Sequence, residues 1–327
     1  MAVDQGYEWG QFQLAETYAE GKLVTQDLEK AFDLYFAAAD KGHTPSIRKV
    51  GEGYLFGRGV KQDAEEATKY LEAAARTGDN SAAWLLGVGF FRGDQGVKID
   101  RPKGLKWLTV AAKGGVVEAQ TFLGAEIIKS ATTSSRLDEG EKWLRLAAGQ
   151  DYAPAHIGLM KLYANPDYGK VDEKMARQHL MAAANLGDPT GELNLGLAYE
   201  SGQFGVPRNQ EKSNLWLLRS AQKGNPRAMY HYAVNVGSGT GMKQDMLAGF
   251  EWTQKAADLG YPKAQAFLAR LLYAGIKNGQ PDKAAAMALL EKVAASGSPT
   301  ARDIADGKMP FDAQAAEKME RELGALE

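Results

Sequence analysis

The chain contains no cysteine among its 327 residues. This absence excludes disulfide bonds, thiolate nucleophiles and metal sites built on cysteine. It does not identify the cellular compartment, because both cytosolic and exported proteins can lack cysteine.

The chain also lacks an excess of charge of one sign and a long apolar run. It has 39 Lys and Arg against 41 Asp and Glu, a net charge of −2, whereas nucleic-acid-binding proteins usually carry a strong basic excess. The longest apolar stretch, near residues 82–91, falls short of the roughly 20 residues that a membrane span requires. The first residues show no basic region followed by an apolar core, so they are not a signal peptide. We therefore expect no nucleic-acid partner and no membrane span.

What the chain does have is an internal repeat of 36 or 37 residues. A closing glycine, replaced once by aspartate, recurs at Gly6, Gly42, Gly78, Gly115, Asp151, Gly187, Gly224, Gly260 and Gly297. A mostly acidic series keeps the same phase at Asp27, Asp63, Asp100, Arg136, Asp172, Asn209, Asp245 and Asp282. A pair of small residues also precedes the closing position, as in Ala74-Ala75. A fixed period of this length predicts a solenoid.

Each repeat has the pattern of two helices, as the second repeat shows. Apolar residues at helical spacing predict a first helix over residues 45–56, which the glycines of residues 57–59 end. Asp63 stands at the N-cap of the second helix, and Glu66 three residues later completes a capping-box pattern. The small residue Gly51 lets the two helices approach closely, and Tyr54 and Tyr70 fill the space between them.

The residues that carry chemistry in other proteins are better explained by structure here. The acidic series supplies one carboxylate per repeat, so the carboxylates do not converge on a metal. No histidine pair has the i, i+4 spacing and glutamate of a zinc hydrolase, and the glycine-rich residues 237–241 follow a helix rather than a strand. Trp107, Trp143, Trp216 and Trp252 share the position of Tyr70, which indicates packing between helices. We predict no catalytic residue, no metal and no cofactor, and therefore not an enzyme.

These repeats resemble the Sel-1-like repeat family, relatives of the tetratricopeptide repeats. The resemblance rests on Val50-Gly51, Tyr54, Gly57, Gly59-Val60, Asp63, Ala67, Tyr70 and Ala74-Ala75, and on Leu195-Gly196, Tyr199, Gly202, Gly205-Val206, Asn209, Trp216 and Ala221. It implies an all-α, right-handed superhelical solenoid of about eight repeats. It also implies a non-catalytic adaptor that binds a protein or peptide, as in bacterial envelope, secretion or signalling assemblies, and favours a periplasmic or exported location.

We predict one solenoid over residues 1–327. Its repeats are expected at 8–42, 43–78, 79–115, 116–151, 152–187, 188–224, 225–260 and 261–297, with a cap at 298–327. Within the cap, the charged segment 313–323 is predicted to be an amphipathic helix that covers the solenoid end. Residues 4–7 align with residues 258–261, so the chain is expected to begin inside a repeat, with any signal peptide upstream. The fourth repeat lacks the glycine turn and has residues 129–136 instead, which favours altered curvature there.

The resemblance also implies where a partner binds, because the first helix of each tetratricopeptide-like unit lines a concave groove. Helix positions flanking the Leu-Gly step, together with aromatic and arginine residues near the helix ends, give the predicted partner-binding residues Phe12, Glu16, Arg48, Glu52, Phe56, Trp84, Phe91, Arg92 and Tyr230. Aromatic residues interleaved with arginine are typical of interface hot spots. Two alternatives stay open at this point. These side chains pack on the next repeat, or the aromatic rings stack on an envelope glycan such as peptidoglycan or exopolysaccharide.

Overall fold

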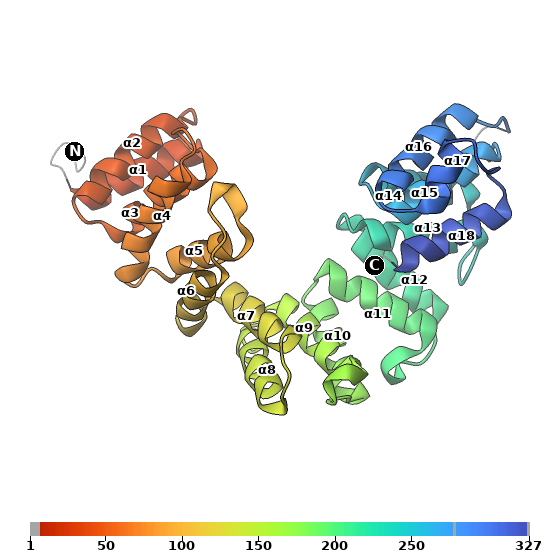
Figure 1. The fold of residues 1–327 in the computed structure, drawn as a ribbon, viewed down its shortest axis with the longest axis horizontal. Helices are drawn as coiled ribbons and strands as arrows, with labels where there is room; N and C mark the ends of the chain where they lie inside the picture. The colour runs from red at the N-terminus through yellow and green to blue at the C-terminus, as the bar shows by residue number, and fades with distance from the viewer. Residues whose placement is uncertain (1–6, 277–278, 326–327) are drawn as a thin grey trace. The chain divides into compact units, whose positions relative to one another are not determined.

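The structure is a computed structural model that describes residues 7–276 and 279–325, and every regular element within them is a helix. The chain divides into two compact units, residues 1–155 and residues 156–327 (Figure 1). The predicted alignment of residues 4–6 lies outside the described residues.

Unit 1 consists of helical hairpins. Its helices are α1 (Glu8–Glu20), α2 (Leu28–Asp40), α3 (Thr44–Phe56), α4 (Ala64–Arg76), α5 (Asn80–Arg92), α6 (Arg101–Lys113), α7 (Val117–Lys129) and α8 (Ser134–Ala148), with a short 3-10 helix η1 (Asp94–Gly96). The pairs of helices in substantial contact within the described part of this unit follow one another along the chain. This is the arrangement expected of a solenoid, in which each repeat packs on its neighbours.

Unit 2 continues the same pattern from within α9. Its helices are α9 (Ala153–Ala164), α10 (Glu173–Asn185), α11 (Pro189–Ser201), α12 (Gln210–Gln222), α13 (Pro226–Ser238), α14 (Met246–Asp258), α15 (Pro262–Tyr273), α16 (Lys283–Ala295), α17 (Pro299–Ala305) and α18 (Ala313–Ala325), with 3-10 helices η2 (Pro166–Tyr168) and η3 (Gln203–Gly205). The predicted class, a solenoid of helical hairpins, is confirmed. That all repeats form one continuous domain stays a prediction.

Helix caps explain the acidic series of the sequence. The Asp63 carboxylate accepts hydrogen bonds from the backbone amides of Glu65 and Glu66, at 3.0 and 3.1 Å. The equivalent bonds begin second helices at Asp27, Asp100, Asp172, Asn209, Asp245 and Asp282. In the fourth hairpin the cap is Thr133, so α8 begins before Arg136 rather than after it. Each cap satisfies an amide that the helix itself leaves unpaired.

The predicted capping box at Asp63 and Glu66 is wrong. Its reciprocal half requires the Glu66 side chain to accept a hydrogen bond from the Asp63 amide. That amide instead donates to the carbonyl of Tyr54 at the end of α3, at 2.9 Å, and Glu66 pairs with Lys69 at 3.3 Å. The hydrogen bond to Tyr54 on the preceding helix therefore uses the Asp63 amide that a capping box would need.

The closing position of each repeat requires a left-handed backbone. Gly42, Gly78 and Gly115 have φ values of 86°, 99° and 89°, and Asp151 adopts a φ of 56° where aspartate replaces the glycine. Asp and Asn tolerate this region better than most residues that carry a Cβ. The repeat therefore keeps its backbone at the substituted position.

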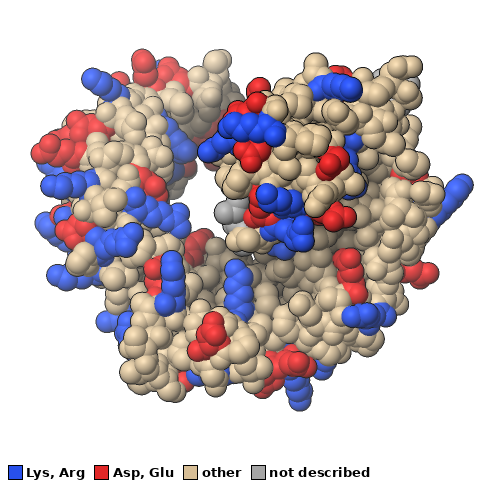
Figure 2. All heavy atoms as spheres, turned by 45° about the vertical axis from the view of Figure 1, so that its right-hand side comes forward, with Lys and Arg blue, Asp and Glu red and all other residues tan. Residues whose placement is uncertain are grey.

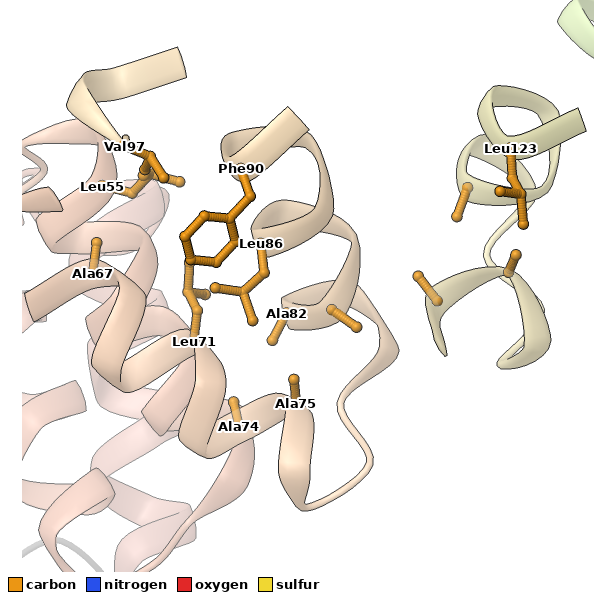
Figure 3. Packing of buried hydrophobic residues seen from close by; sticks show 14 of the residues in the cluster. Leu55, Ala67, Leu71, Ala74, Ala75, Ala82, Leu86, Phe90, Val97 and Leu123 are labelled. Atoms are coloured by element: carbon orange, nitrogen blue, oxygen red, sulfur yellow. The ribbon is translucent and has the colours of Figure 1, made fainter. Parts of the chain in front are cut away.

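The core of each hairpin depends on close approach of two helices, as Gly51 shows. A Cβ on Gly51 would lie 2.7 Å from Cγ of Leu71, so only glycine allows α3 and α4 to pack at this distance. The neighbouring cluster alternates alanines such as Ala67 and Ala74 with larger buried residues such as Leu71 and Phe90 (Figure 3). Small residues that face large ones fill the space between helices without voids.

The last two helices depart from the hairpin pattern. α17 has only seven residues, and α18 packs against α15 and α17, both first helices of their repeats. Ala315, Met319 and Leu323, spaced four residues apart, are buried in this contact. The predicted amphipathic helix over residues 313–323 is confirmed.

Candidate functional site

Two groups of side chains in unit 1 contain six of the predicted partner-binding residues, namely Glu16, Arg48, Glu52, Trp84, Phe91 and Arg92. The first, the polar network, consists of Glu16, Tyr35, Arg48, Lys49, Glu52 and Asp79. The second, the aromatic patch, consists of Trp84, Phe91, Arg92 and Phe122. Both groups lie on first helices of the hairpins, except Tyr35 on α2 and the cap residue Asp79.

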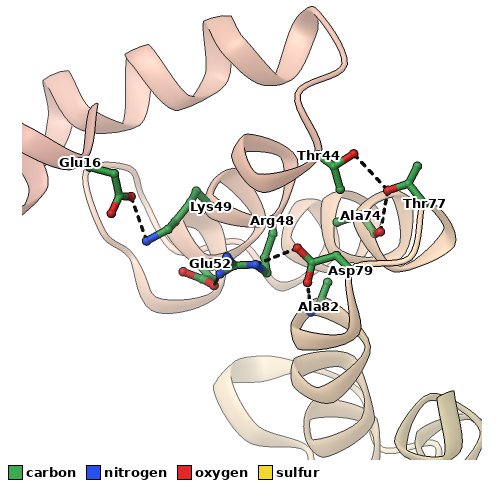
Figure 4. A network of polar contacts seen from close by, with 9 residues as sticks. All are labelled: Glu16, Thr44, Arg48, Lys49, Glu52, Ala74, Thr77, Asp79 and Ala82. Carbon is green, nitrogen blue, oxygen red and sulfur yellow. Dashed lines mark hydrogen bonds and ion pairs between the residues drawn. The ribbon is translucent and has the colours of Figure 1, made fainter. Parts of the chain in front are cut away.

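The polar network links three successive hairpins through ion pairs (Figure 4). The Arg48 guanidinium donates to the Asp79 carboxylate at 2.9 Å and also pairs with Glu52 on its own helix. Asp79 in turn caps α5 by accepting from the amide of Ala82 at 2.9 Å. Arg48 and Glu52, which the sequence places at a partner site, therefore already have charged partners inside the protein.

Glu16 belongs to the other end of the same network. It pairs with Lys49 at 3.1 Å and accepts a hydrogen bond from the hydroxyl of Tyr35. Burial favours the neutral carboxyl, but the hydrogen bonds from Tyr35 and Lys49 outweigh it and hold the pKa of Glu16 below its ordinary value. Burial and the neighbouring Glu16 raise the pKa of Tyr35. Phe12 packs beside these groups, with its ring 5.7 Å from that of Tyr35 and 5.0 Å from that of His43.

The aromatic patch brings together rings from α5 and α7. Phe122 lies at its centre, with ring centroids 6.1 Å from Trp84 and 5.1 Å from Phe91, both in edge-to-face contact. The guanidinium of Arg92 stacks over Phe122 at 5.2 Å. Trp84, Phe91 and Phe122 are half-buried and Arg92 is exposed, so the patch presents apolar surface with a fixed positive charge.

Phe122 is the residue that the sequence analysis missed. It directly follows Thr121, which has the same repeat position as Arg48 and Trp84. The repeat gives a signal for this position, because the sixth residue of a first helix is also large in other repeats: it is Lys49 in an earlier repeat and Phe267 in a later one. One helix face is wide enough to present two adjacent positions.

The two remaining predicted residues lie in different surroundings. The Phe56 ring is 39% exposed at the end of α3, with the Arg58 guanidinium 5.1 Å from its centroid. Tyr230 on α13 is only 7% exposed, and its hydroxyl donates to Glu320 on α18 at 2.8 Å. The position of Tyr230 is thus covered by the C-terminal helix of the same chain.

Two histidines that the sequence separates come together in the fifth hairpin. The Nδ1 atoms of His156 on α9 and His179 on α10 are 2.9 Å apart, and the His179 ring stacks on Tyr163. One ring nitrogen donates and the other accepts. Across residues 7–276 and 279–325, no group of three His, Asp or Glu side chains is arranged to hold a metal ion.

A hollow of about 750 Å³ lies between α4 and α6, which are the second helices of their hairpins. Its walls include Phe90, with Lys103 over the ring at 4.1 Å. The cations around it are largely paired, since Glu72 binds both Lys103 at 2.7 Å and Arg76 at 2.9 Å. On the face visible in Figure 2, basic and acidic side chains are likewise interspersed.

No described helix is long and apolar enough to cross a membrane.

Known proteins match the repeats along most of the chain. The family described as Sel1 repeat matches residues 10–43, 44–79, 80–116, 155–188, 189–225, 226–261 and 262–298. The unmatched segment holds the fourth hairpin, the one without the glycine turn. Repeats of this family form protein-interaction scaffolds and are in general not catalytic.

Solved structures and curated relatives share the architecture. A Sel1 repeat protein from Oxalobacter formigenes is 28% identical, with a TM-score of 0.71 over 94% of this chain and 89% of that one. The protective antigen c5321 of uropathogenic Escherichia coli, described as displaying an SLR fold, is 26% identical, with a TM-score of 0.69 over 99% of this chain and 70% of that one. Chitin synthase regulatory factor 3 of Schizosaccharomyces pombe is 29% identical over 78% of this chain but only 28% of its own length.

The chain spans less than half the length of the curated relatives matched first. The repeats themselves nevertheless match over most of residues 10–298 in sequence and in fold. The chain therefore belongs to the Sel1 repeat family.

Proposed function

We propose that this chain is a non-catalytic adaptor that binds a partner protein or peptide through the aromatic patch on the first helices of unit 1. The partner and the setting, a bacterial envelope, secretion or signalling assembly, are part of this proposal. The name of the regulatory factor from fission yeast is consistent with an adaptor role.

One observation carries the proposal. Among the predicted partner-binding residues of unit 1, the charged ones on α1 and α3 are held by ion pairs within the protein, whereas the aromatic patch combines half-exposed rings with an exposed arginine. Trp, Tyr and Arg dominate the binding energy of protein interfaces. The rings of Trp84, Phe91 and Phe122 already pack against one another, so these side chains would lose little conformational freedom when a partner binds.

The test is retention of a partner by the whole protein. The purified chain serves as bait for lysate and envelope fractions of its source organism, and wild type is compared with the double variant Trp84→Ala, Phe91→Ala. We expect a specific protein that wild type retains and the variant loses, with both proteins giving the same far-ultraviolet circular dichroism.

The matched control is Phe36→Ala, on the second helix α2. Phe36 is 41% exposed and also packs against aromatic neighbours, so its loss removes a comparable ring away from the patch. Retention of the partner by all three proteins would contradict the patch as the site. Binding to purified peptidoglycan or exopolysaccharide, with no retained protein, would contradict the adaptor function in favour of a glycan ligand.

A further inference from the structure

The repeat places two equivalent aromatic pairs in the two units. Trp84 and Tyr230 are each the fifth residue of α5 and α13, and Phe122 and Phe267 are each the sixth residue of α7 and α15. The ring centroids are 6.1 Å apart in the first pair and 6.0 Å in the second, and both contacts are edge-to-face.

An arginine accompanies each pair. The Arg92 guanidinium stacks over Phe122 at 5.2 Å, and that of Arg270 stacks over Phe267 at 4.9 Å. The two arginines come from different helix positions, one from α5 and the other from α15. The same local chemistry, two edge-to-face rings with a guanidinium on one of them, thus occurs twice in the chain.

In unit 2 this surface has an occupant. α18 covers Tyr230 and Phe267 with Ala316, Met319 and Leu323, and these residues line a small pocket of about 20 Å³. The hydroxyl of Tyr230 donates to Glu320, on the same side of α18 as this stripe. The occupant is therefore an amphipathic helix with an apolar stripe and a glutamate beside it.

In unit 1 the equivalent surface lies between α5 and α7, and no helix of residues 7–155 packs across it in the way α18 packs on α15. The indole of Trp84 offers an N–H donor where Tyr230 offers its hydroxyl. Within residues 7–276 and 279–325, that N–H donates to no acceptor. Arg92 on Phe122 and Arg101, 5.5 Å from the ring of Phe91, add positive charge beside the rings.

We propose that the aromatic patch binds an amphipathic α-helix of a partner protein, with an apolar stripe on the rings and glutamates that face Trp84 and Arg92. This inference rests on the proposed adaptor function and specifies its ligand. A helix laid in a groove is read by a few anchors at i, i+3, i+4 and i+7, and α18 presents Ala316, Met319, Glu320 and Leu323 with this spacing.

The probe is a synthetic peptide with the sequence of residues 312–325, added to the full chain. Isolated helices of this length are marginal in water, so one form carries a hydrocarbon staple between the exposed positions of Glu317 and Arg321. We expect saturable binding in fluorescence anisotropy, at least tenfold tighter for the stapled form. Trp84→Ala with Phe122→Ala should weaken it at least tenfold, and Phe36→Ala should leave it within twofold.

Peptide variants and cross-linking identify the contacts. Serine at the positions of Met319 and Leu323 should abolish binding, and lysine at the position of Glu320 should weaken it at least fivefold. A photoreactive group at the position of Met319 should label α5 or α7. Labelling confined to α13 and α15, where the peptide would displace α18, would overturn the proposal, and so would unchanged affinity for the Trp84 and Phe122 variant.

The outcomes separate this inference from the function beneath it. If a natural partner is lost with Trp84→Ala and Phe91→Ala while the stapled peptide does not bind, the adaptor function stands and the helical ligand is wrong. If neither binds through the patch, both are wrong. Self-association that is lost both with Trp84→Ala and on truncation after Pro310 would replace the partner protein with the α18 helix of a second copy.

Discussion

The hydroxyl of Tyr230 donates a hydrogen bond of 2.8 Å to the carboxylate of Glu320, a residue 90 positions later in the chain. This bond joins α13 to α18 across two repeats, whereas most contacts in the protein join neighbouring helices. It shows that the first-helix face of this solenoid accepts a helix, and it defines the chemistry of that contact.

Burial of Met319, rather than the hydrogen bond of Glu320, should hold α18 in place. Met319 is fully buried, so Met319→Ala should cost about 2–5 kcal/mol of docking free energy, whereas Glu320→Ala should cost about 1 kcal/mol because its carboxylate is exposed. Hydrogen exchange of the amides in residues 313–325 measures this docking directly, which suits a repeat array that need not unfold as one unit. The exposed Glu317→Ala is the control, and an equal loss of protection in all three variants would contradict the ranking.

Docking of α18 should weaken at acidic pH through Glu322. Its carboxylate accepts hydrogen bonds from the hydroxyls of Ser298 and Thr300, at 2.5 and 2.6 Å, and from the amide of Thr300 at 3.2 Å. Burial opposes ionisation, but these bonds outweigh it and lower the pKa of Glu322. Because the folded-state pKa lies below the unfolded value of about 4.3, the stabilisation is complete above that value and lost as pH falls through the folded pKa.

The methyl signals of Met319 and Leu323 in NMR spectra report this docking between pH 6 and pH 3. We expect wild type to lose docking on acidification, and Glu322→Gln to be weaker at pH 6 but nearly independent of pH. Parallel loss of docking in wild type and variant would assign the effect to other carboxyl groups.

Two turn glycines should differ sharply in their tolerance of alanine. Gly42 and Gly59 both have a positive φ, 86° and 73°. A Cβ on Gly42 meets no atom within 4 Å, whereas one on Gly59 would lie 1.9 Å from the carbonyl oxygen of Leu28. Gly42→Ala should therefore cost only the left-handed backbone, about 1–2 kcal/mol, and Gly59→Ala should cost clearly more, about 3 kcal/mol or above.

Urea unfolding of the two glycine variants, followed by circular dichroism, makes the comparison. Equal midpoints would mean that the turn of residues 57–60 shifts to accommodate the new methyl group.

Arg48 should act on stability through its ion pairs. Its side chain is 23% exposed and those of Glu52 and Asp79 are 19% and 13% exposed. Arg48→Ala removes the cation that both carboxylates share, so it should lower the free energy of unfolding by about 1–2 kcal/mol. This is less than the roughly 3–5 kcal/mol expected when a fully buried pair is broken. Arg76→Ala, which breaks an i, i+4 pair with a 71% exposed arginine, should cost at most about 0.5 kcal/mol.

Thermal unfolding of the two arginine variants tests this contrast. A stable Arg48→Ala variant that no longer retains the partner would instead return Arg48 to the binding site.

Much of the fold followed from local rules in the sequence. Asp63 was predicted as an N-cap and is one, because a cap needs only its own carboxylate and the next three amides. Asp151 keeps the left-handed closing position for another local reason, because aspartate tolerates a positive φ better than most residues with a Cβ. Glu66 was predicted wrongly because the amide it required is taken by Tyr54, a residue of the preceding helix.

The candidate site was less predictable. The register placed Trp84 and Phe91 correctly on the first helices, but Arg48 and Trp84 occupy the same repeat position and have different surroundings. Whether a side chain at that position is exposed or paired depends on the neighbouring repeat. A one-residue offset also hid Phe122 from the predicted series.

The sequence by itself determined the period, the helix caps and the close packing at Gly51, because these depend on residues a few positions apart or one helix away. Only the tertiary structure decided that Tyr230 lies beneath α18 while Trp84 and Phe122 stay half-exposed. The reason is that a solenoid specifies its neighbours through the repeat, whereas docking of α18 on α15 depends on where the short helix α17 turns the chain.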